Sequence, residues 1–407
     1  MQIAIIGGGA SGLACAIESA RKAKRQGVKA DITIYEANEK VGKKILATGN
    51  GRCNLTNLNA GGDFYLGDTK LAKAVNEKFS ALDNLDFFKS LGLYTRHDSE
   101  GRVYPLSNQA TSVLDVLRFE CERLGVNFVC DFRVNKLQKV VGGFDLGDSH
   151  FAHKVVFACG GKAGVKNFNA YDFLKKYGFS FTKVSPSLTK LTTDTTYTKP
   201  LKGVRANVKL ALCIDDQTVA EEVGEILFAD YGLSGIAIMQ LSAFVTRHFQ
   251  KSKTNPKITI DFVQNFSHEE LTHELNEIYK RNRYILPENL LTGFIPKKIG
   301  LVILKSLNIA ANRPMKTANV LSRIAQKCKE FEFEVTGVKD FSDAQVTSGG
   351  LNSKQININT LESIKHKNLF FCGELLDVDG LCGGFNLQFA WSSGRLCGQN
   401  VITNEKI

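Results

Sequence analysis

The chain has 407 residues, of which 43% are hydrophobic and 23% are charged. At about 100 to 200 residues per domain, this length predicts two or three domains, and the ordinary globular composition excludes a disordered linker or a fibrous chain. No apolar run reaches the ~18 residues that a membrane-spanning helix needs, and the first residues lack the features of a signal peptide. We therefore expect a cytoplasmic protein with no membrane partner.

Basic residues exceed acidic ones, and the formal net charge is +11. The excess is concentrated between residues 247 and 330, which carry fifteen basic and seven acidic residues. A basic region of this kind favours a polyanionic partner such as nucleic acid. A solvated lysine-rich surface is the alternative explanation of the same charge.

The ten cysteines are scattered and include no C-x-x-C pair, and none of the seven histidines stands at metal-ligand spacing. In a long chain without a secretory signal, this pattern is typical of reduced thiols rather than of a disulfide framework. We expect no metal site.

The first element in chain order is a short apolar run, residues 2–6, which predicts a strand. Gly7, Gly9 and Gly12 follow it in G-x-G-x-x-G spacing and lead into a segment with helical periodicity. A second predicted strand ends on Glu36. This βαβ pattern binds dinucleotides, because the glycines permit a tight turn, close approach to a pyrophosphate and close packing of the helix, while the acid accepts the ribose hydroxyls.

The rest of the chain alternates between two patterns. Helices are predicted over residues 76–90 and 112–124, and a strand over residues 154–158 that closes on Gly160. From about residue 186, short strands (204–214, 218–223, 257–262, 332–338) mix with helices (267–280, 287–291, 297–310, 316–327). A strand at residues 368–372 and a helix from 386 to about 401 then restore the first pattern.

These patterns predict an α/β protein with a discontinuous domain and an insertion. Residues 1–185 and 341–407 form the doubly wound, dinucleotide-binding domain, and residues 186–340 form an inserted α+β substrate domain that combines a β-barrel with helices.

Two further segments favour FAD over NAD as the dinucleotide. Residues 42–57 form a loop rich in glycine and amide side chains that contains two lysines, which suits a long cofactor. Residues 371–388 supply an acid, Glu374, at a strand end and then a helix that starts at Gly383–Gly384. A helix N-terminus at that place would stabilise negative charge on a reduced flavin.

Together with residues 1–57, the segments 101–105, 231–235, 347–351 and 372–398 resemble a bacterial family of FAD-containing flavoproteins. These proteins have a glutathione-reductase-type FAD-binding domain with an inserted substrate domain, and the resemblance spans nearly the whole chain. Members are described as NAD(P)/FAD-dependent oxidoreductases, some linked to aminoacetone oxidation, some to reduction of unsaturated bile-acid ketones, and some to dihydrouridine formation in ribosomal RNA.

The resemblance implies the residues that bind FAD. The pyrophosphate would contact Gly7, Gly9, Ala10, Ser11 and Gly12, and the adenosine ribose would contact Glu36. The flavin side would contact Lys44, Arg52, Cys53 and Asn54, the ribityl chain Glu374, and the isoalloxazine Gly384, Phe385, Asn386 and Leu387, with Gly160 and Gly373 beside the cofactor. The chain departs from the family pattern at residues 162–172 and at Leu381–Cys382.

Cys53 and Cys382 are the catalytic candidates, because both lie in loops expected to face the flavin. A thiol there could donate a proton to a substrate carbon after hydride transfer. Packing is the alternative role, since most intracellular cysteines behave as small buried hydrophobes. We expect Trp391, in the C-terminal helix, to pack in the core. Residues 279–284 interleave basic and aromatic side chains, which suits RNA contact or a solvated helix end.

The leading hypothesis is an FAD-dependent oxidoreductase that moves hydride from NAD(P)H to an activated C=C bond. NAD(P)H would be a transient reductant, because the chain has only one dinucleotide fingerprint. The favoured substrate is a uridine of ribosomal RNA, reduced to dihydrouridine, since the basic inserted domain is otherwise unexplained. The alternatives are oxidoreduction of a small amine or enone, and a flavin-binding redox protein without turnover.

Overall fold

The computed structural model describes residues 1–165, 168, 170–314 and 319–403. The chain divides into two compact units. Unit 1 comprises Met1–Ser185 and Val346–Ile407, and unit 2 comprises Pro186–Gln345. Each unit has its own hydrophobic core.

Unit 1 is built on a five-stranded parallel sheet with the strand order β20-β11-β1-β2-β7. Its strands are β1 (Gln2–Ile6), β2 (Asp31–Tyr35), β7 (Asn127–Val129), β11 (Lys154–Phe157) and β20 (Leu369–Phe371). The crossover from β1 to β2 is α1 (Ala10–Gln26), so the chain opens with the predicted βαβ unit and its parallel strand pair. The carboxyl ends of β1, β2, β11 and β20 therefore lie along one edge of the sheet.

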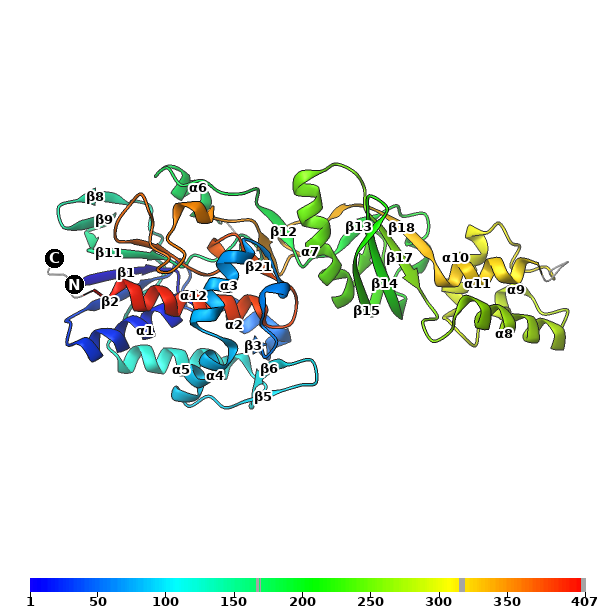
Figure 1. The fold of residues 1–407 in the computed structure, drawn as a ribbon, viewed down its shortest axis with the longest axis horizontal. Coiled ribbons are helices and arrows are strands. Elements are labelled where there is room, and N and C mark those ends of the chain that lie inside the picture. Colours follow the sequence, from blue (N-terminus) through cyan, green and yellow to red (C-terminus); the bar gives the residue numbers. More distant parts are fainter. Residues whose placement is uncertain (166–167, 169, 315–318, 404–407) are drawn as a thin grey trace. The chain divides into compact units, whose positions relative to one another are not determined.

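Different elements cover the two faces of this sheet. Helices α1, α5 (Ala110–Arg123) and α12 (Phe385–Val401) lie on one side, and the antiparallel strands β8 (Gln138–Val140), β9 (Gly143–Gly147) and β10 (His150–Ala152) lie on the other (Figure 1). The helices turn apolar stripes toward the strands, as the full burial of Leu13 and Ile17 on α1 shows.

The remaining elements of unit 1 are short. They are α2 (Lys43–Ala47), β3 (Thr56–Asn57), β4 (Tyr65–Gly67), α3 (Thr69–Lys78), α4 (Ala81–Ser90), β5 (Thr95–His97), β6 (Arg102–Pro105), α6 (Ala170–Lys175), β12 (Ser185–Ser187), β19 (Val346–Ser348) and β21 (Val378–Gly380), with 3-10 turns at Thr48–Gly51, Gly62–Phe64, Ser353–Gln355 and Gly373–Leu375. β12 continues into unit 2 at residues 186 and 187.

The single helix predicted over residues 76–90 is in fact two helices. Ser80 has extended backbone and accepts a hydrogen bond from the Asp83 amide, while the Asp83 carboxylate accepts one from the Ser80 amide. This reciprocal capping box satisfies amides that a new helix exposes, so α3 ends and α4 begins here.

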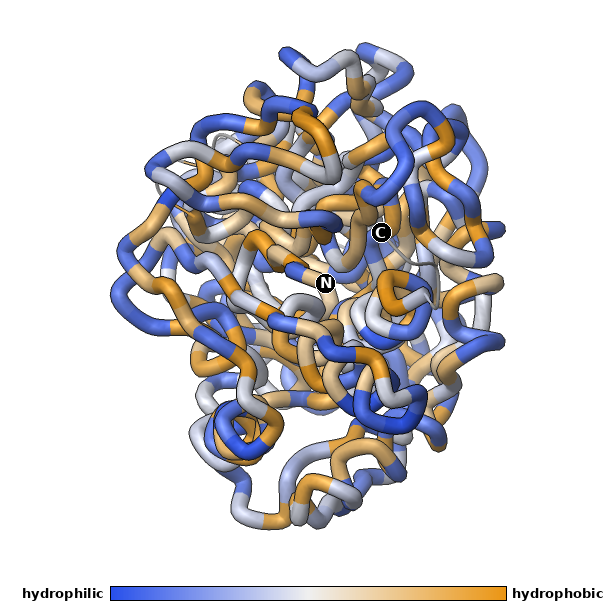
Figure 2. Tube along the Cα trace, turned by 90° about the vertical axis from the view of Figure 1, so that its left-hand side faces the viewer, coloured by the Kyte–Doolittle hydropathy of each residue, from blue (hydrophilic) through white to orange (hydrophobic). Residues whose placement is uncertain are grey.

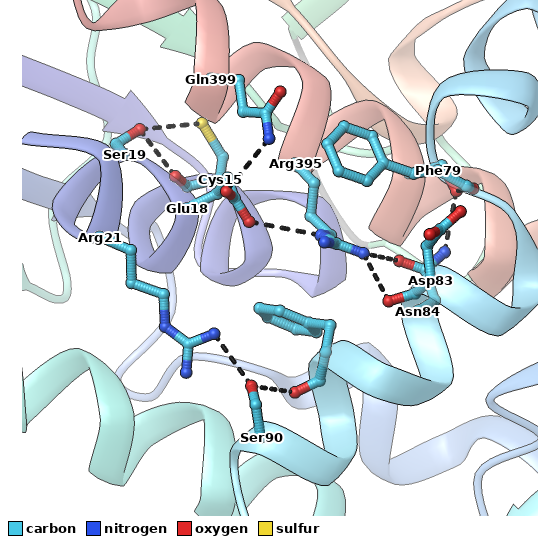
Figure 3. A network of polar contacts seen from close by, with 12 residues as sticks. Cys15, Glu18, Ser19, Arg21, Phe79, Asp83, Asn84, Ser90, Arg395 and Gln399 are labelled. Atoms are coloured by element: carbon cyan, nitrogen blue, oxygen red, sulfur yellow. Dashed lines mark hydrogen bonds and ion pairs between the residues drawn. The ribbon is translucent and has the colours of Figure 1, made fainter. Parts of the chain in front are cut away.

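An ion-pair network joins α1 to α12 (Figure 3). Arg395 on α12 donates to Glu18 on α1 at 3.4 Å and to Asn84 on α4 at 3.0 Å, and its guanidinium lies 4.2 Å from the ring centroid of Phe79. Glu18 and Arg395 are both largely buried, with side chains 6% and 12% exposed. Removal of Glu18 would leave the largely buried Arg395 without its ion-pair partner, whereas Glu18 also pairs with Arg25 at 3.3 Å, so the network helps to fix how the two helices pack.

Unit 2 contains a closed six-stranded barrel with the strand order β13-β16-β15-β14-β17-β18. Its strands are β13 (Leu191–Thr193), β14 (Arg205–Ile214), β15 (Gln217–Ala229), β16 (Gly232–Ser234), β17 (Lys257–Asp261) and β18 (Phe331–Val338). Along β14, the side chains of Val208, Leu210 and Leu212 are fully buried and alternate with more exposed residues, which is the two-residue period of a barrel wall.

Helices complete unit 2. α8 (His268–Arg281), α9 (Pro287–Leu290), α10 (Lys297–Ser306) and α11 (Val320–Lys329) form a module at one end of the barrel (Figure 1). α7 (Ile236–Lys251) packs on β15, and the sequence reading predicted no element there. The signal for α7 was present, because Ile238, Leu241 and Val245 recur at helical spacing and are all fully buried.

Figure 2 colours the chain by hydropathy and shows hydrophilic and hydrophobic stretches that alternate along most of the trace. Among the described residues, no helix is both long enough and apolar enough to cross a lipid bilayer.

Candidate functional site

The glycine turn after β1 has an open side and a packed side. Gly7 has a φ of +111°, and a side chain at Gly7 or Gly12 would collide with backbone oxygens, of Ala158 and Gly7 respectively. At Gly9, by contrast, an added Cβ would meet nothing within 4 Å. The turn therefore has free space at the residue that immediately precedes α1, where the first amides of the helix attract an anion.

Glu36 is anchored against this turn. One carboxylate oxygen accepts the Gly8 amide at 2.8 Å, and the other accepts the Asn38 amide at 2.9 Å. The side chain is buried. The oxygen that accepts the Asn38 backbone amide also accepts the Asn38 side-chain amide at 2.5 Å, so the oxygen bound to Gly8 is the one that keeps a lone pair for a ligand hydroxyl.

Glu374 and Lys44 form an ion pair at 2.6 Å. The second oxygen of Glu374 accepts the Thr347 amide at 2.8 Å, and the Thr347 hydroxyl oxygen accepts the Ala163 amide at 2.9 Å. A Cβ at Gly161 would lie 2.5 Å from that hydroxyl and 2.7 Å from Glu374. The carboxylate is therefore held by three chain segments that lie far apart in the sequence.

The side chains of Tyr171 and Ser11 lie beside the turn that carries Glu374. Burial, and then the charge of Glu374, raise the pKa of Tyr171 on α6 above its ordinary value. Gly373, with a φ of +72°, faces Ser11 at the start of α1 so closely that a side chain would collide with the serine, and its amide donates to Ser393 at 2.9 Å. The end of β20 and the N-terminus of α1 thus meet at one place.

The loop at residues 49–54 meets the N-terminus of α12. Gly384, with a φ of +102°, approaches so closely that a Cβ there would lie 2.5 Å from the Thr56 carbonyl oxygen and 2.8 Å from Asn54 Oδ1. Asn54 Oδ1 is buried and has no hydrogen-bond partner. A buried amide oxygen without a donor is costly, and a ligand that supplies an N–H or O–H group here would remove that cost.

The turn before α12 is braced by its own side chains. Asn386 accepts the Gly380 amide at 2.8 Å and donates to the Gly380 carbonyl at 2.7 Å. Phe385 stacks on Phe64 with ring centroids 4.4 Å apart, and its carbonyl accepts the Tyr65 hydroxyl at 3.0 Å. The side chains of Phe385 and Asn386 are therefore engaged within the protein, which leaves the backbone of this turn as the part available to a ligand. Leu387 is partly buried against the same core.

The two catalytic candidates differ in exposure. Cys53 is fully buried and has a φ of +59°. Burial raises the pKa of its thiol to about 12, although a hydrogen bond with Thr48 acts in the opposite direction. Cys382 is half-buried in the turn before α12. A protonated thiol at neutral pH is compatible with a proton donor and also with simple packing, so the catalytic role of both residues stays a prediction.

Arg52 and Gly160 complete the set of expected binding residues. Arg52 is exposed, and its guanidinium lies 5.1 Å from the ring centroid of Tyr104. Gly160, just after β11, has a φ of +70° and open space where a side chain would lie. Residues 166, 167 and 169 of the divergent segment 162–172 lie outside the described residues.

The residues of unit 1 fit a dinucleotide that carries a flavin. Glu374, Gly9 and Glu36 follow β20, β1 and β2, whose carboxyl ends lie along one edge of the sheet, and the unpartnered oxygen of Asn54 borders Gly384 at the start of α12. Sequence reasoning missed Thr347 and Gly161, which position Glu374. Thr347 lies in the segment 347–351 that carried the family resemblance, and that was its only signal.

The basic stretch of unit 2 is only partly neutralised. Lys280 pairs with Glu277 at 2.7 Å and Lys297 with Glu288 at 3.2 Å. Arg281, Arg283 and Lys298 are exposed and form no ion pair within the described part of the chain. Across those same residues, no group of three or more His, Cys, Asp or Glu side chains could hold a metal ion.

Comparisons with known proteins show the family of the chain. A family model described as "HI0933-like protein Rossmann domain" matches residues 1–400. A 3-dehydro-bile acid Δ(4,6)-reductase of Clostridium scindens is 36% identical over 408 residues, which cover 98% of each chain. Ribosomal RNA dihydrouridine synthases of Escherichia coli and Haemophilus influenzae are 28% and 26% identical, covering 98% of this chain and 97% of theirs.

The matches extend over nearly the full length of the chain and of its relatives, and the glycine turn after β1 lies within the matched range. The resemblance drawn from the motifs is thereby confirmed. The chain belongs to the HI0933-like family of Rossmann-domain flavoprotein oxidoreductases, and it is an enzyme of that class.

Proposed function

We propose that the protein uses FAD and NAD(P)H to reduce a C=C bond conjugated to a carbonyl group, and that the favoured substrate is a uridine of ribosomal RNA. FAD, when bound, supplies hydride transfer between a nicotinamide donor and such a substrate. The relatives support the bond type, because the names of all three describe reduction of this kind: a bile acid Δ(4,6)-reductase and two dihydrouridine synthases.

The protein would hold the cofactor with groups from four places in unit 1. The amides of Ala10 and Ser11 would bind the pyrophosphate, and Glu36 would accept the ribose hydroxyls. Glu374, oriented by Thr347 and Lys44, would accept hydroxyls of the ribityl chain.

The amides that begin α12 would meet the flavin ring. Their positive dipole end favours negative charge on the ring, and the Asn54 amide would satisfy its free oxygen by accepting a ring N–H group. Gly384 permits this close approach.

The observation that supports an RNA substrate is the unbalanced charge of unit 2. Arg281 and Arg283, at the end of α8, are exposed and free of carboxylate partners within the described residues, and the ring of Tyr284 next to them is 84% exposed. Guanidinium groups bind phosphates, and exposed rings stack on unpaired bases. A uracil base must leave a helix to be reduced, so the favoured target is a loop or an incompletely assembled ribosomal particle.

A small enone is the second candidate, favoured by the 36% identity with the bile acid reductase. In that case, the basic residues of unit 2 would form a solvated surface without a polyanionic partner.

Mass spectrometry of ribosomal RNA from a deletion strain tests the first candidate. We expect that one dihydrouridine is replaced in the deletion strain by uridine, which is lighter by two hydrogens. Restoring the gene should bring the dihydrouridine back. An unchanged RNA, together with NADPH-dependent reduction of a 3-keto-4-ene steroid by the purified protein, would favour the second candidate.

A further inference from the structure

Two arginines in unit 1 share one aromatic ring. The guanidinium carbons of Arg52 and Arg96 lie 5.1 Å and 5.5 Å from the ring centroid of Tyr104. The ring is buried, whereas both arginines are exposed. Cation–π contacts with one fixed ring keep the two guanidinium carbons within about 11 Å of each other at the surface.

Neither arginine is neutralised by the protein. Arg52 donates to the Gly49 carbonyl at 3.2 Å, and Arg96 donates to the Asn108 amide oxygen at 2.7 Å. Within the described residues, neither forms an ion pair with an Asp or Glu. Arg102 on the same hairpin is neutralised, by contrast, because it pairs with Asp98 at 2.8 Å and with Glu100 at 2.9 Å.

This pair of charges lies next to the expected flavin. Tyr104 is in β6, directly across from Arg96 in β5, and β6 also pairs with β3 through Val103 and Thr56. The Tyr104 ring borders Gly49 in the loop that leads to Asn54, and the Thr56 carbonyl borders Gly384. One small sheet, β3-β6-β5, thus connects the arginines to the turn before α12.

An anion near Tyr104 is attracted by both of these unneutralised guanidinium groups. Guanidinium geometry matches phosphate oxygens. Tyr94 lies two residues before Arg96, just before β5 begins, and its side chain is 64% exposed. An exposed ring beside a phosphate site suits the base of a nucleotide.

We propose that Arg52, Arg96 and Tyr94 form a nucleotide-phosphate binding site beside the flavin edge of unit 1. Two ligands could supply the phosphate group: the phosphodiester backbone of a polynucleotide, or NADPH through its 2′-phosphate. The polynucleotide source rests on the function proposed above, whereas the NADPH source requires only a nicotinamide donor.

The test variant is Arg96→Gln, because Arg96 has no expected contact with the cofactor. Arg118→Gln on α5 is the matched control, since it also removes one exposed charge but from an arginine that pairs with Glu122. Both variants are prepared as full-length, FAD-loaded protein and checked by flavin absorbance and thermal unfolding. Arg96→Lys keeps the charge without the fork geometry and serves as the conservative variant.

Two probes separate the sources. The first is a fluorescein-labelled single-stranded RNA of about twelve nucleotides, whose binding is followed by anisotropy across a salt series. The second is anaerobic flavin reduction by NADPH and, in parallel, by NADH, which lacks the 2′-phosphate. A polynucleotide site predicts that Arg96→Gln weakens RNA binding about tenfold or more and lowers the log–log salt slope by about one unit. A donor site predicts a similar rise in the Kd for NADPH and no change for NADH.

Either of these results, with Arg96→Lys less impaired than Arg96→Gln, supports the site. If Arg96→Gln matches Arg118→Gln with both probes, the inference is overturned. It is also overturned if Lys and Gln at position 96 cause equal losses together with a lowered melting temperature, which would indicate a structural role. Ribosomal RNA that keeps all its dihydrouridine in a deletion strain would refute the proposed function but leave the NADPH result standing.

Discussion

Lys44 Nζ lies 2.6 Å from Glu374 Oε2, although 330 residues separate them in the chain. The pair joins α2 to the 3-10 turn that follows β20, and both side chains keep some solvent exposure, 42% and 18% respectively. An ion pair at this exposure adds little to stability. Its main consequence is orientation, because it fixes the carboxylate that the Thr347 amide also holds.

The first prediction concerns this pair. Glu374→Gln should weaken FAD binding by about 1 to 3 kcal/mol, because a neutral amide is a weaker acceptor for ligand hydroxyls, and Lys44→Met should weaken it less. Titration of apoprotein with FAD by fluorescence quenching measures both. Lys136→Met is the control, since Lys136 also pairs at 2.6 Å, with Asp145, and is similarly exposed. Equal affinities in Glu374→Gln and Lys136→Met would place the ribityl chain elsewhere.

The second prediction concerns the adenosine half of the cofactor. The purified protein should be yellow and should release FAD rather than FMN on denaturation. Glu36→Ala should weaken FAD binding by about 1 to 3 kcal/mol, because it removes the ribose acceptor and also the acceptor of the Gly8 and Asn38 amides. Glu39→Ala, at an exposed neighbouring position, should bind FAD normally. Recovery of FMN alone would contradict the assignment.

The third prediction concerns close approach at α12. Gly384→Val should abolish flavin binding or flavin reduction, because Gly384 has a left-handed φ and its Cβ would lie 2.5 Å from the Thr56 carbonyl oxygen. Gly142→Val shares the left-handed backbone, with a φ of +80°, but has open space around it. Flavin absorbance per chain and the rate of reduction by dithionite compare the two. A normal spectrum and rate in Gly384→Val would show that this turn is not at the isoalloxazine.

The fourth prediction concerns the two thiols. A thiol with a pKa of about 12 has roughly one part in 10⁴ as thiolate at pH 8, so Cys53 should resist iodoacetamide in the folded protein. Half-buried Cys382 should be alkylated first, as should half-buried Cys213, which serves as the internal reference. Peptide mass spectrometry over time gives the order. Alkylation of Cys53 as fast as of Cys382 would mean that its loop opens to solvent.

The fifth prediction concerns the charge of unit 2. Replacing Lys280, Arg281 and Arg283 together by Gln should weaken binding to ribosomal RNA fragments and flatten its salt dependence, because each lost phosphate contact removes close to one unit of slope. Flavin content should stay normal. The control removes the same charge from Lys202, Arg205 and Lys209, which pair with Asp230, Glu225 and Glu221. If both triple variants keep the full slope, the excess charge is a solvated surface.

The sequence by itself determined the opening βαβ unit of unit 1. The strand, glycine turn and helix around Gly7 to Gly12 depend on interactions within about 30 residues, and so their pattern appears directly in the chain. The strands β14, β17 and β18 were predicted to within one residue at either end for the same reason, since each shows a two-residue alternation of its own. The family followed from motifs that the comparisons confirm.

Only the tertiary structure decided what those motifs do together. It placed Glu374 on Lys44 and Thr347, Gly384 on Asn54, and Arg96 on Tyr104, and each of these pairs depends on sheet register or on close packing between distant segments. The spacing of residues along the sequence does not predict such contacts. The tertiary structure also buries Cys53 and so raises the pKa of its thiol. Desolvation depends on all the atoms that surround a side chain and not on its neighbours in sequence.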